Sequence, residues 1–162
     1  MKDVLHEIVE KLDQLKSMDE AIAMAIDLEE EGRAYYLDRL SKMKNPAAIS
    51  IYKFLADEEE KHAQYLKQFR DSKETPEIDF HIPEFKASFT EEFSNEELEE
   101  IGILLAALRF EHKSELFYME MANRAENENQ VKFFEDVAAA ERMHYSIIDE
   151  LLEAATEFRM QT

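Results

Sequence analysis

Apolar residues recur at spacings of three and four positions over five separate stretches of the chain. The pattern predicts helices over residues 3–16, 18–44, 46–70, 95–125 and 127–158. The first is a short amphipathic helix, whose apolar stripe must pack against the main body or against another subunit. The other four are long enough to form a bundle. Only two Gly and three Pro occur in 162 residues, which is typical of an almost entirely helical protein.

Helix-start signals separate these stretches. Ser17–Glu20 and Ser94–Glu97 each have the spacing of a capping box, in which a Ser is followed three positions later by a Glu. Asn45 precedes Pro46, a favoured first residue of a helix, and Asn127 is suited to cap the last helix. Because the breaks near Asn45 and Asn127 are short, each flanking pair of helices is expected to be antiparallel.

Residues 71–94 lack the helical period and separate the two helix pairs. They contain two of the three prolines and four phenylalanines, a composition that favours an extended, packed crossover over a disordered linker. A segment of this length can run back along the preceding helix. We therefore predict an all-α four-helix bundle of two helical hairpins joined by a long crossover. Residues 1–17 form the N-terminal helix, and residues 18–162 form the bundle.

The two predicted hairpins repeat each other after 82 positions without a gap. Core positions fall on core positions, and the caps Asn45 and Asn127 coincide. Six residues with side chains that can bind metals repeat in the same way. They are Glu29 and Glu111, Glu59-x-x-His62, and Glu141-x-x-His144.

These six side chains lie on the apolar lines of their helices and are expected to point inward. Residues three apart share one helical face, and the hairpin geometry places all six at a similar height. Four buried carboxylates need compensating cations, and two divalent ions supply four positive charges. An oxygen-rich set with two imidazoles favours iron or manganese over zinc. We therefore expect two iron ions, with manganese or a mixed pair as alternatives.

A solvent-facing interpretation is common for one Glu-x-x-His in an acidic helix, and the repeat makes metal binding the better interpretation here. Glu30 and Glu31 compete with Glu29, which shares its line with apolar residues and is mirrored by Glu111. We assign the following charged or titratable residues to the surface or to non-ligand positions: Asp57, Glu58, Glu60, His6, His81 and His112.

Tyr36 and Tyr118 lie two turns after Glu29 and Glu111. They are either aromatic core residues or hydroxyl donors that hold the carboxylates in place.

The net charge of −19 repels phosphate groups, so nucleic acid and anionic membranes are poor partners. The chain has no Cys, which excludes disulfides, iron–sulfur clusters and thiolate zinc sites. No signal peptide is apparent, and no apolar run approaches the ~20 residues that span a membrane. A cytoplasmic location is expected.

The repeated motifs resemble the ferritin-like superfamily, and within it stand-alone di-iron carboxylate proteins related to rubrerythrin, with no rubredoxin module. The similarity covers about residues 18–158. It rests on Glu29-x-x-Gly32-x-x-Tyr35-Tyr36, Glu59-x-x-His62, Glu111-x-x-Ser114-x-x-Phe117-Tyr118 and Glu141-x-x-His144. The resemblance implies a ferritin-like bundle with a dinuclear centre.

Two departures from rubrerythrins are visible. The four-Cys rubredoxin module of those proteins is missing, and Ser114 occupies the place of an additional Glu that is linked there to movement of one iron between redox states. The remaining six residues are closer to the simpler ferritin or bacterioferritin pattern.

Three functions stay open. The first is an oxidoreductase that reacts a diferrous centre with peroxide or dioxygen and draws on an unknown electron donor. The second is ferroxidase activity, iron handling or iron storage, and the third is a metal-free structural bundle. The apolar stripe of the first helix suggests a homodimer.

Overall fold

The chain folds into five helices and no strand within the part described by the computed structural model, residues 3–81 and 98–160. The helices are α1 (Val4–Asp13), α2 (Met18–Leu40), α3 (Pro46–Ser72), α4 (Leu98–Asn123) and α5 (Glu128–Met160). The predicted all-α class is therefore confirmed. None of these helices combines the length and the apolar character that crossing a membrane requires.

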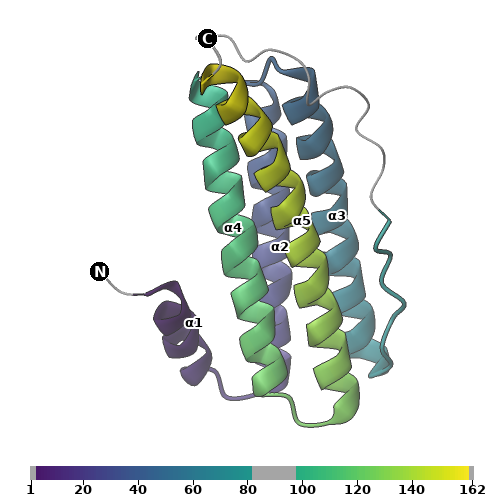
Figure 1. Cartoon of the computed structure of the whole chain (residues 1–162). Coiled ribbons are helices and arrows are strands. Elements are labelled where there is room, and N and C mark those ends of the chain that lie inside the picture. Colours follow the sequence, from purple (N-terminus) through teal and green to yellow (C-terminus); the bar gives the residue numbers. More distant parts are fainter. Residues whose placement is uncertain (1–2, 82–97, 161–162) are drawn as a thin grey trace.

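Helices α2 to α5 form the bundle, and α1 lies against its side next to α4 (Figure 1). The closest packing is within two hairpins, α2 with α3 and α4 with α5. Short turns join the helices of each hairpin, so the partners are antiparallel. This arrangement confirms the predicted ferritin-like four-helix bundle with a short N-terminal helix.

Side-chain caps fix three of the helix starts. The Ser17 hydroxyl accepts a hydrogen bond from the backbone N–H of Glu20 at 3.1 Å. The Asn45 and Asn127 side chains accept equivalent bonds from the third residue beyond each, at 3.1 Å and 2.9 Å. The Glu20 carboxylate reaches back to the N–H of Lys16 at 2.7 Å, one residue before the expected Ser17. The second predicted capping box, at 94–97, lies outside the described residues.

Helix α2 ends at Leu40, four residues before the predicted end at Lys44. The chain tightens there into turns in which Met43 N–H bonds the Leu40 carbonyl at 3.2 Å. Glu100 of α4 then accepts hydrogen bonds from the N–H groups of Lys44 and Asn45, the latter at 2.9 Å. The apolar spacing continues through Met43, but contacts with α4 end the helix earlier.

The core consists of two apolar clusters, one on each side of a buried polar layer. One cluster joins the first half of α2 to the last turns of α3 and α4 and the first half of α5. The other joins the end of α2 to the first half of α3, the start of α4 and the second half of α5. The buried Glu and His side chains lie between the two clusters, at mid-height of the bundle.

Residues 73–81, the described part of the crossover, run back along the outside of α3 without helical structure (Figure 1). Asp79 N–H donates to the Tyr65 hydroxyl of α3 at 3.1 Å, and Thr75 donates to the Asn129 carbonyl of α5 at 3.4 Å. This part agrees with the predicted extended and packed segment. The remaining predicted crossover residues, 82–94, lie outside the described part of the chain.

Candidate metal centre

All six predicted metal-binding residues lie in the polar layer. None is more than 3% exposed, and each bundle helix contributes at least one of them. Glu29 comes from α2, Glu111 from α4, and the two Glu-x-x-His pairs from α3 and α5. Each residue occupies the inward face of its helix, because the apolar residues one turn before and after it are buried in the two core clusters.

The two imidazoles point their Nδ1 atoms at the carboxylates. His62 Nδ1 lies 2.9 Å from Glu141 Oε1 and 3.6 Å from Glu29 Oε2. His144 Nδ1 lies 3.4 Å from Glu111 Oε2 and 3.7 Å from Glu141 Oε2. The rings are stacked, with centroids 5.3 Å apart and planes 11° from parallel. Glu141 therefore lies between the two histidines and contacts both.

The side chains form two overlapping groups that could each hold a metal ion. In each group, one donor atom per residue lies within 4.8 Å of every other. Glu29, His62 and Glu141 form the first group, and Glu59, Glu111, Glu141 and His144 form the second. Glu141 is common to both groups, and Glu59 belongs only to the second.

Several buried polar atoms have no hydrogen-bond partner, which tests whether this set fits a metal. In the carboxylates of the polar layer the unpartnered atoms are Glu29 Oε2, Glu59 Oε1, Glu111 Oε2 and Glu141 Oε2, and in its imidazoles they are His62 Nε2 and His144 Nδ1. A buried charged group without a partner is strongly destabilising. Divalent cations would satisfy the carboxylate oxygens and His144 Nδ1, and oxygen donors with two imidazoles suit iron or manganese.

The proton affinities of the site show the same excess of negative charge. Burial disfavours the charged form of His62, but the carboxylates of Glu29 and Glu141 outweigh it and raise its pKa to about 10. Burial, together with the charges of Glu111 and Glu29, raises the pKa of Glu141 to about 8. Burial and the neighbouring carboxylates likewise hold the pKa of Glu59 well above its ordinary value. In the metal-free protein, bound protons therefore compensate part of the negative charge that metal cations would otherwise neutralise.

The two tyrosines donate across the bundle, each to the other hairpin. Tyr118 of α4 donates to Glu29 Oε1 of α2 at 2.5 Å, and Tyr36 of α2 donates to Glu111 Oε1 of α4. Burial and the nearby carboxylates raise the pKa of both phenols well above the ordinary value, so both stay protonated. Of the two interpretations of these residues, the structure supports hydroxyl donors that hold the carboxylates in place.

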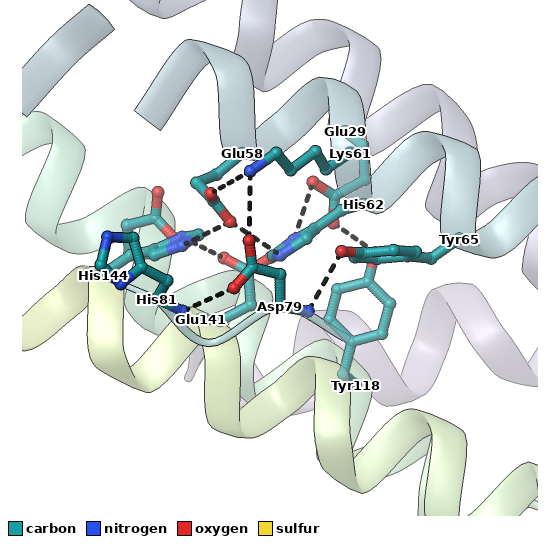
Figure 2. A network of polar contacts seen from close by, with 11 residues as sticks. Glu29, Glu58, Lys61, His62, Tyr65, Asp79, His81, Tyr118, Glu141 and His144 are labelled. Atoms are coloured by element: carbon teal, nitrogen blue, oxygen red, sulfur yellow. Dashed lines mark hydrogen bonds and ion pairs between the residues drawn. The ribbon is translucent and has the colours of Figure 1, made fainter. Parts of the chain in front are cut away.

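Glu58 is a site residue that the sequence interpretation assigned wrongly to the surface. It is only 3% exposed and faces the Nε2 atoms of both histidines (Figure 2), whereas the other carboxylates face the Nδ1 atoms. Glu58, His62 and His144 also have donor atoms within 4.8 Å of one another. A signal was available, because Ile51, Leu55, Glu58, His62 and Leu66 follow one another at spacings of three and four.

The residues set aside as non-ligands are mostly far from this chemistry. His6 and His112 are exposed, and His6 pairs with Glu10 at 3.2 Å. His81 is also exposed, but it lines a small cavity together with Glu58 and His144. Ser114, in the place of the additional rubrerythrin Glu, is buried at 2% exposure.

A surface pocket of about 370 Å³ opens between α2 and α3 and reaches the polar layer. Glu29 and Glu59 line its inner side. Two ion pairs between the helices cross its rim, Arg33 with Glu60 at 3.7 Å and Lys67 with Glu30 at 3.3 Å. The pocket brings solvent close to two of the buried carboxylates.

Comparison with known proteins agrees with this architecture. The family model described as Rubrerythrin matches residues 20–151, well over half of the chain, and the match includes all six predicted ligands. Searches of curated proteins and of solved structures found no match. The helical bundle, the buried Glu and His groups and the family match lead to one conclusion: the chain belongs to the rubrerythrin family of the ferritin-like superfamily.

Proposed function

We propose that the protein binds two iron ions in the polar layer and works as a di-iron oxidoreductase that consumes peroxide or dioxygen. The observation that supports this most strongly is the pair of buried donor groups that share Glu141. Their unpartnered carboxylate atoms are the feature that a structural bundle without metal does not need. Manganese and a mixed pair are the alternatives for the same donors.

In this proposal Glu29 and Glu111 are terminal ligands, one for each ion. Glu59 and Glu141 would be shared between the two ions, and His62 and His144 would each hold one ion through Nδ1. Tyr118 and Tyr36 hold the terminal carboxylates by hydrogen bonds to the oxygens that do not face the histidines. The two apolar clusters exclude water from above and below the layer.

Two bound iron ions would supply two-electron chemistry toward peroxide or dioxygen, cycling between the diferrous and diferric states. The chain keeps the donors fixed and dry for this reaction, because all six ligand side chains are buried. The pocket between α2 and α3 gives a small oxidant a short path to Glu29 and Glu59. Electrons would come from a separate donor protein or small reductant.

Iron handling is the second candidate, and the net charge of −19 favours it. A strongly acidic surface raises the local concentration of Fe²⁺. The carboxylates at the rim and base of the α2–α3 pocket would then guide ferrous ions to a ferroxidase centre. In this case Fe²⁺ would be the substrate, oxidised to Fe³⁺ with dioxygen or peroxide as the electron acceptor, and the product would pass to a store.

Metal titration tests the site itself. We expect the metal-free protein to bind two Co²⁺ or Fe²⁺ ions per chain and to be stabilised by about 2.7 kcal/mol per site at a free metal concentration 100 times the Kd. Glu59→Ala combined with His144→Ala should reduce binding to one ion per chain or fewer, because both residues belong to the second group and the first keeps Glu29, His62 and Glu141. Calorimetric titration and thermal unfolding with and without a chelator measure both effects.

A matched control removes one exposed Glu and one exposed His. Glu135→Ala combined with His112→Ala should leave two ions bound, because both side chains are exposed to solvent. Equal metal binding by the two double variants would reject the proposed site.

Single-turnover oxidation separates the two functions. The Fe²⁺-loaded protein is mixed with peroxide or dioxygen, and the oxidised iron is followed by absorbance. Two irons oxidised per chain and then re-reduced by a donor indicate an oxidoreductase. Tens of irons retained per chain indicate storage, and this result would overturn the first proposal.

A further inference from the structure

We propose that Glu58 is a positioning residue that directs the Nδ1 atoms of both His62 and His144 toward the metals. This inference rests on the proposed function, because it assigns a partner to the two histidine ligands. One oxygen, Oε2, lies 3.8 Å from His144 Nε2 and 4.0 Å from His62 Nε2. A single carboxylate thus faces the outer nitrogen of both rings (Figure 2).

The stacking of the two rings makes this shared contact geometrically feasible. The imidazoles are nearly parallel, and their inner Nδ1 atoms both face carboxylates of the polar layer. Their outer Nε2 atoms therefore face the same side, where Glu58 of α3 lies buried between them. His62 Nε2 has no hydrogen-bond partner and is itself fully buried, and the carboxylate of Glu58 lies 4.0 Å from it.

Glu58 breaks the symmetry between the two halves of the bundle. The repeat places Ala140 of α5 at the corresponding position, and Ala140 is 3% exposed. A second carboxylate on that side would add a buried charge next to the first, at high energetic cost. The bundle instead uses one carboxylate for two histidines.

On its solvent side, Glu58 is linked through Lys61 to Asp79 of the crossover. Its other oxygen, Oε1, accepts from Lys61 Nζ at 3.2 Å, and Lys61 also lies 3.6 Å from Asp79 Oδ2. Asp79 is in turn tied to α3 through its N–H bond to Tyr65. Lys61 and Asp79 line a surface pocket of about 390 Å³ over Glu58, so this series of contacts connects the histidines to solvent.

The position of Glu58 affects which nitrogen of each imidazole carries the proton. A neutral imidazole carries its proton on one nitrogen and offers the other as a ligand. A carboxylate facing Nε2 favours the tautomer with the proton there, which leaves the Nδ1 lone pair for a metal. At 3.8 to 4.0 Å the interaction in this structure is electrostatic, since a direct hydrogen bond is shorter.

The test compares Glu58→Gln with Asp57→Asn. The second variant also removes one negative charge, but from the preceding position of α3, which is exposed. With Co²⁺ as the probe, we expect Glu58→Gln to weaken binding about 10- to 100-fold, the usual effect of losing such a partner. Asp57→Asn should change it less than about twofold, because an exposed charge is screened. Circular dichroism checks that both variants keep their helices.

Nitrogen-15 NMR of the Zn²⁺-loaded proteins gives a readout that a purely structural role would not change. We expect protonated Nε2 and metal-bound Nδ1 on both histidines, with faster Nε2–H exchange in Glu58→Gln than in Asp57→Asn. If Glu58→Gln fails to fold, Lys61→Met replaces it, since it leaves the carboxylate but removes its anchor. It should weaken Co²⁺ binding more than Asp57→Asn does, and an affinity equal to that of Asp57→Asn would then overturn the positioning role.

Three outcomes would contradict either the positioning role of Glu58 or the proposed function. Unchanged Co²⁺ affinity and unchanged Nε2–H exchange in Glu58→Gln would overturn the positioning role alone. Three Co²⁺ ions bound by the wild type and two by Glu58→Gln would show that Glu58 is a ligand, which also overturns it. No Co²⁺ bound by the wild type would instead reject the proposed function.

Discussion

Gly32 of α2 shows how closely single residues are fitted around the polar layer. A Cβ added there would lie 2.7 Å from the Phe110 ring and 3.0 Å from Glu59 Oε2. Both distances are tighter than ordinary packing contacts, so the side chain of α4 and the carboxylate of α3 need a residue without a Cβ at this point. The sequence showed Gly32 only as part of a motif, because the closeness of Phe110 depends on how α2 and α4 pack.

We predict that Gly32→Ala will not show the stabilisation of about 1 kcal/mol that Ala normally brings to a helix interior. The displacement of Phe110 or Glu59 should offset it by about 1–3 kcal/mol. Urea denaturation of the metal-free protein measures this difference. The other glycine is the control: a Cβ on Gly102 meets nothing within 4 Å, so Gly102→Ala should stabilise the protein. Equal gains in both variants would contradict the fit at Gly32.

The internal repeat identified the six predicted ligands but not Glu58, which has no acidic counterpart in the other half. The six predicted ligands were recognisable because each lies on an inward line and has an identical counterpart 82 positions away in the other half. Glu58 appears once, with Ala140 as its counterpart, and lies in an acidic run where solvated carboxylates are common. Its contact with both rings depends on the stacking of His62 on His144, a contact between α3 and α5.

At the scale of the helices, the ends depend on both local and tertiary contacts. The caps at Ser17, Asn45 and Asn127 are local and were predicted correctly. The end of α3 was placed two residues early. The helix continues to Ser72 and is closed by Lys73 in a left-handed conformation, with φ of 62° and an N–H bond to the Phe69 carbonyl at 2.9 Å. The sequence does not predict this helix end, because Lys is not a usual residue for the left-handed conformation.

Lys73→Gly should therefore be more stable than Lys73→Ala by about 1 kcal/mol. Both variants lose the exposed ion pair with Asp19, found at 3.3 Å, so this loss cancels in the comparison. Only the Gly variant adopts a positive φ without steric cost. Thermal or urea unfolding of the two variants measures the difference, and equal stabilities would show that the left-handed end is not populated in solution.

At the scale of the whole molecule, the bundle encloses an unbalanced set of acids, and its stability should depend on pH when no metal is bound. His62 has a pKa of about 10 in the folded protein against an ordinary value of 6.5. Its stabilising contribution is complete below pH 6.5 and is lost as the pH rises toward 10. Glu141 acts in the same direction, since its pKa of about 8 lies above the ordinary 4.5.

We predict that the unfolding free energy of the metal-free protein falls by on the order of a few kcal/mol between pH 6.5 and 10. Denaturant titrations across this range measure it. The Zn²⁺-loaded protein is the control, because bound metal replaces these protons and its affinity rises with pH. A flat profile for the metal-free protein would contradict the raised pKa values.

The sequence by itself determined the helical class, the two hairpins, the inward Glu and His lines and the match between the two halves. These features follow from local spacing, which side chains on one helix obey wherever the helix is packed. Only the tertiary structure decided the cross-bundle bonds of Tyr36 and Tyr118, the end of α2 at Leu40 and the contact of one Glu58 oxygen with both histidines. Each of these depends on the distance between side chains of different helices, which periodicity along one helix does not contain.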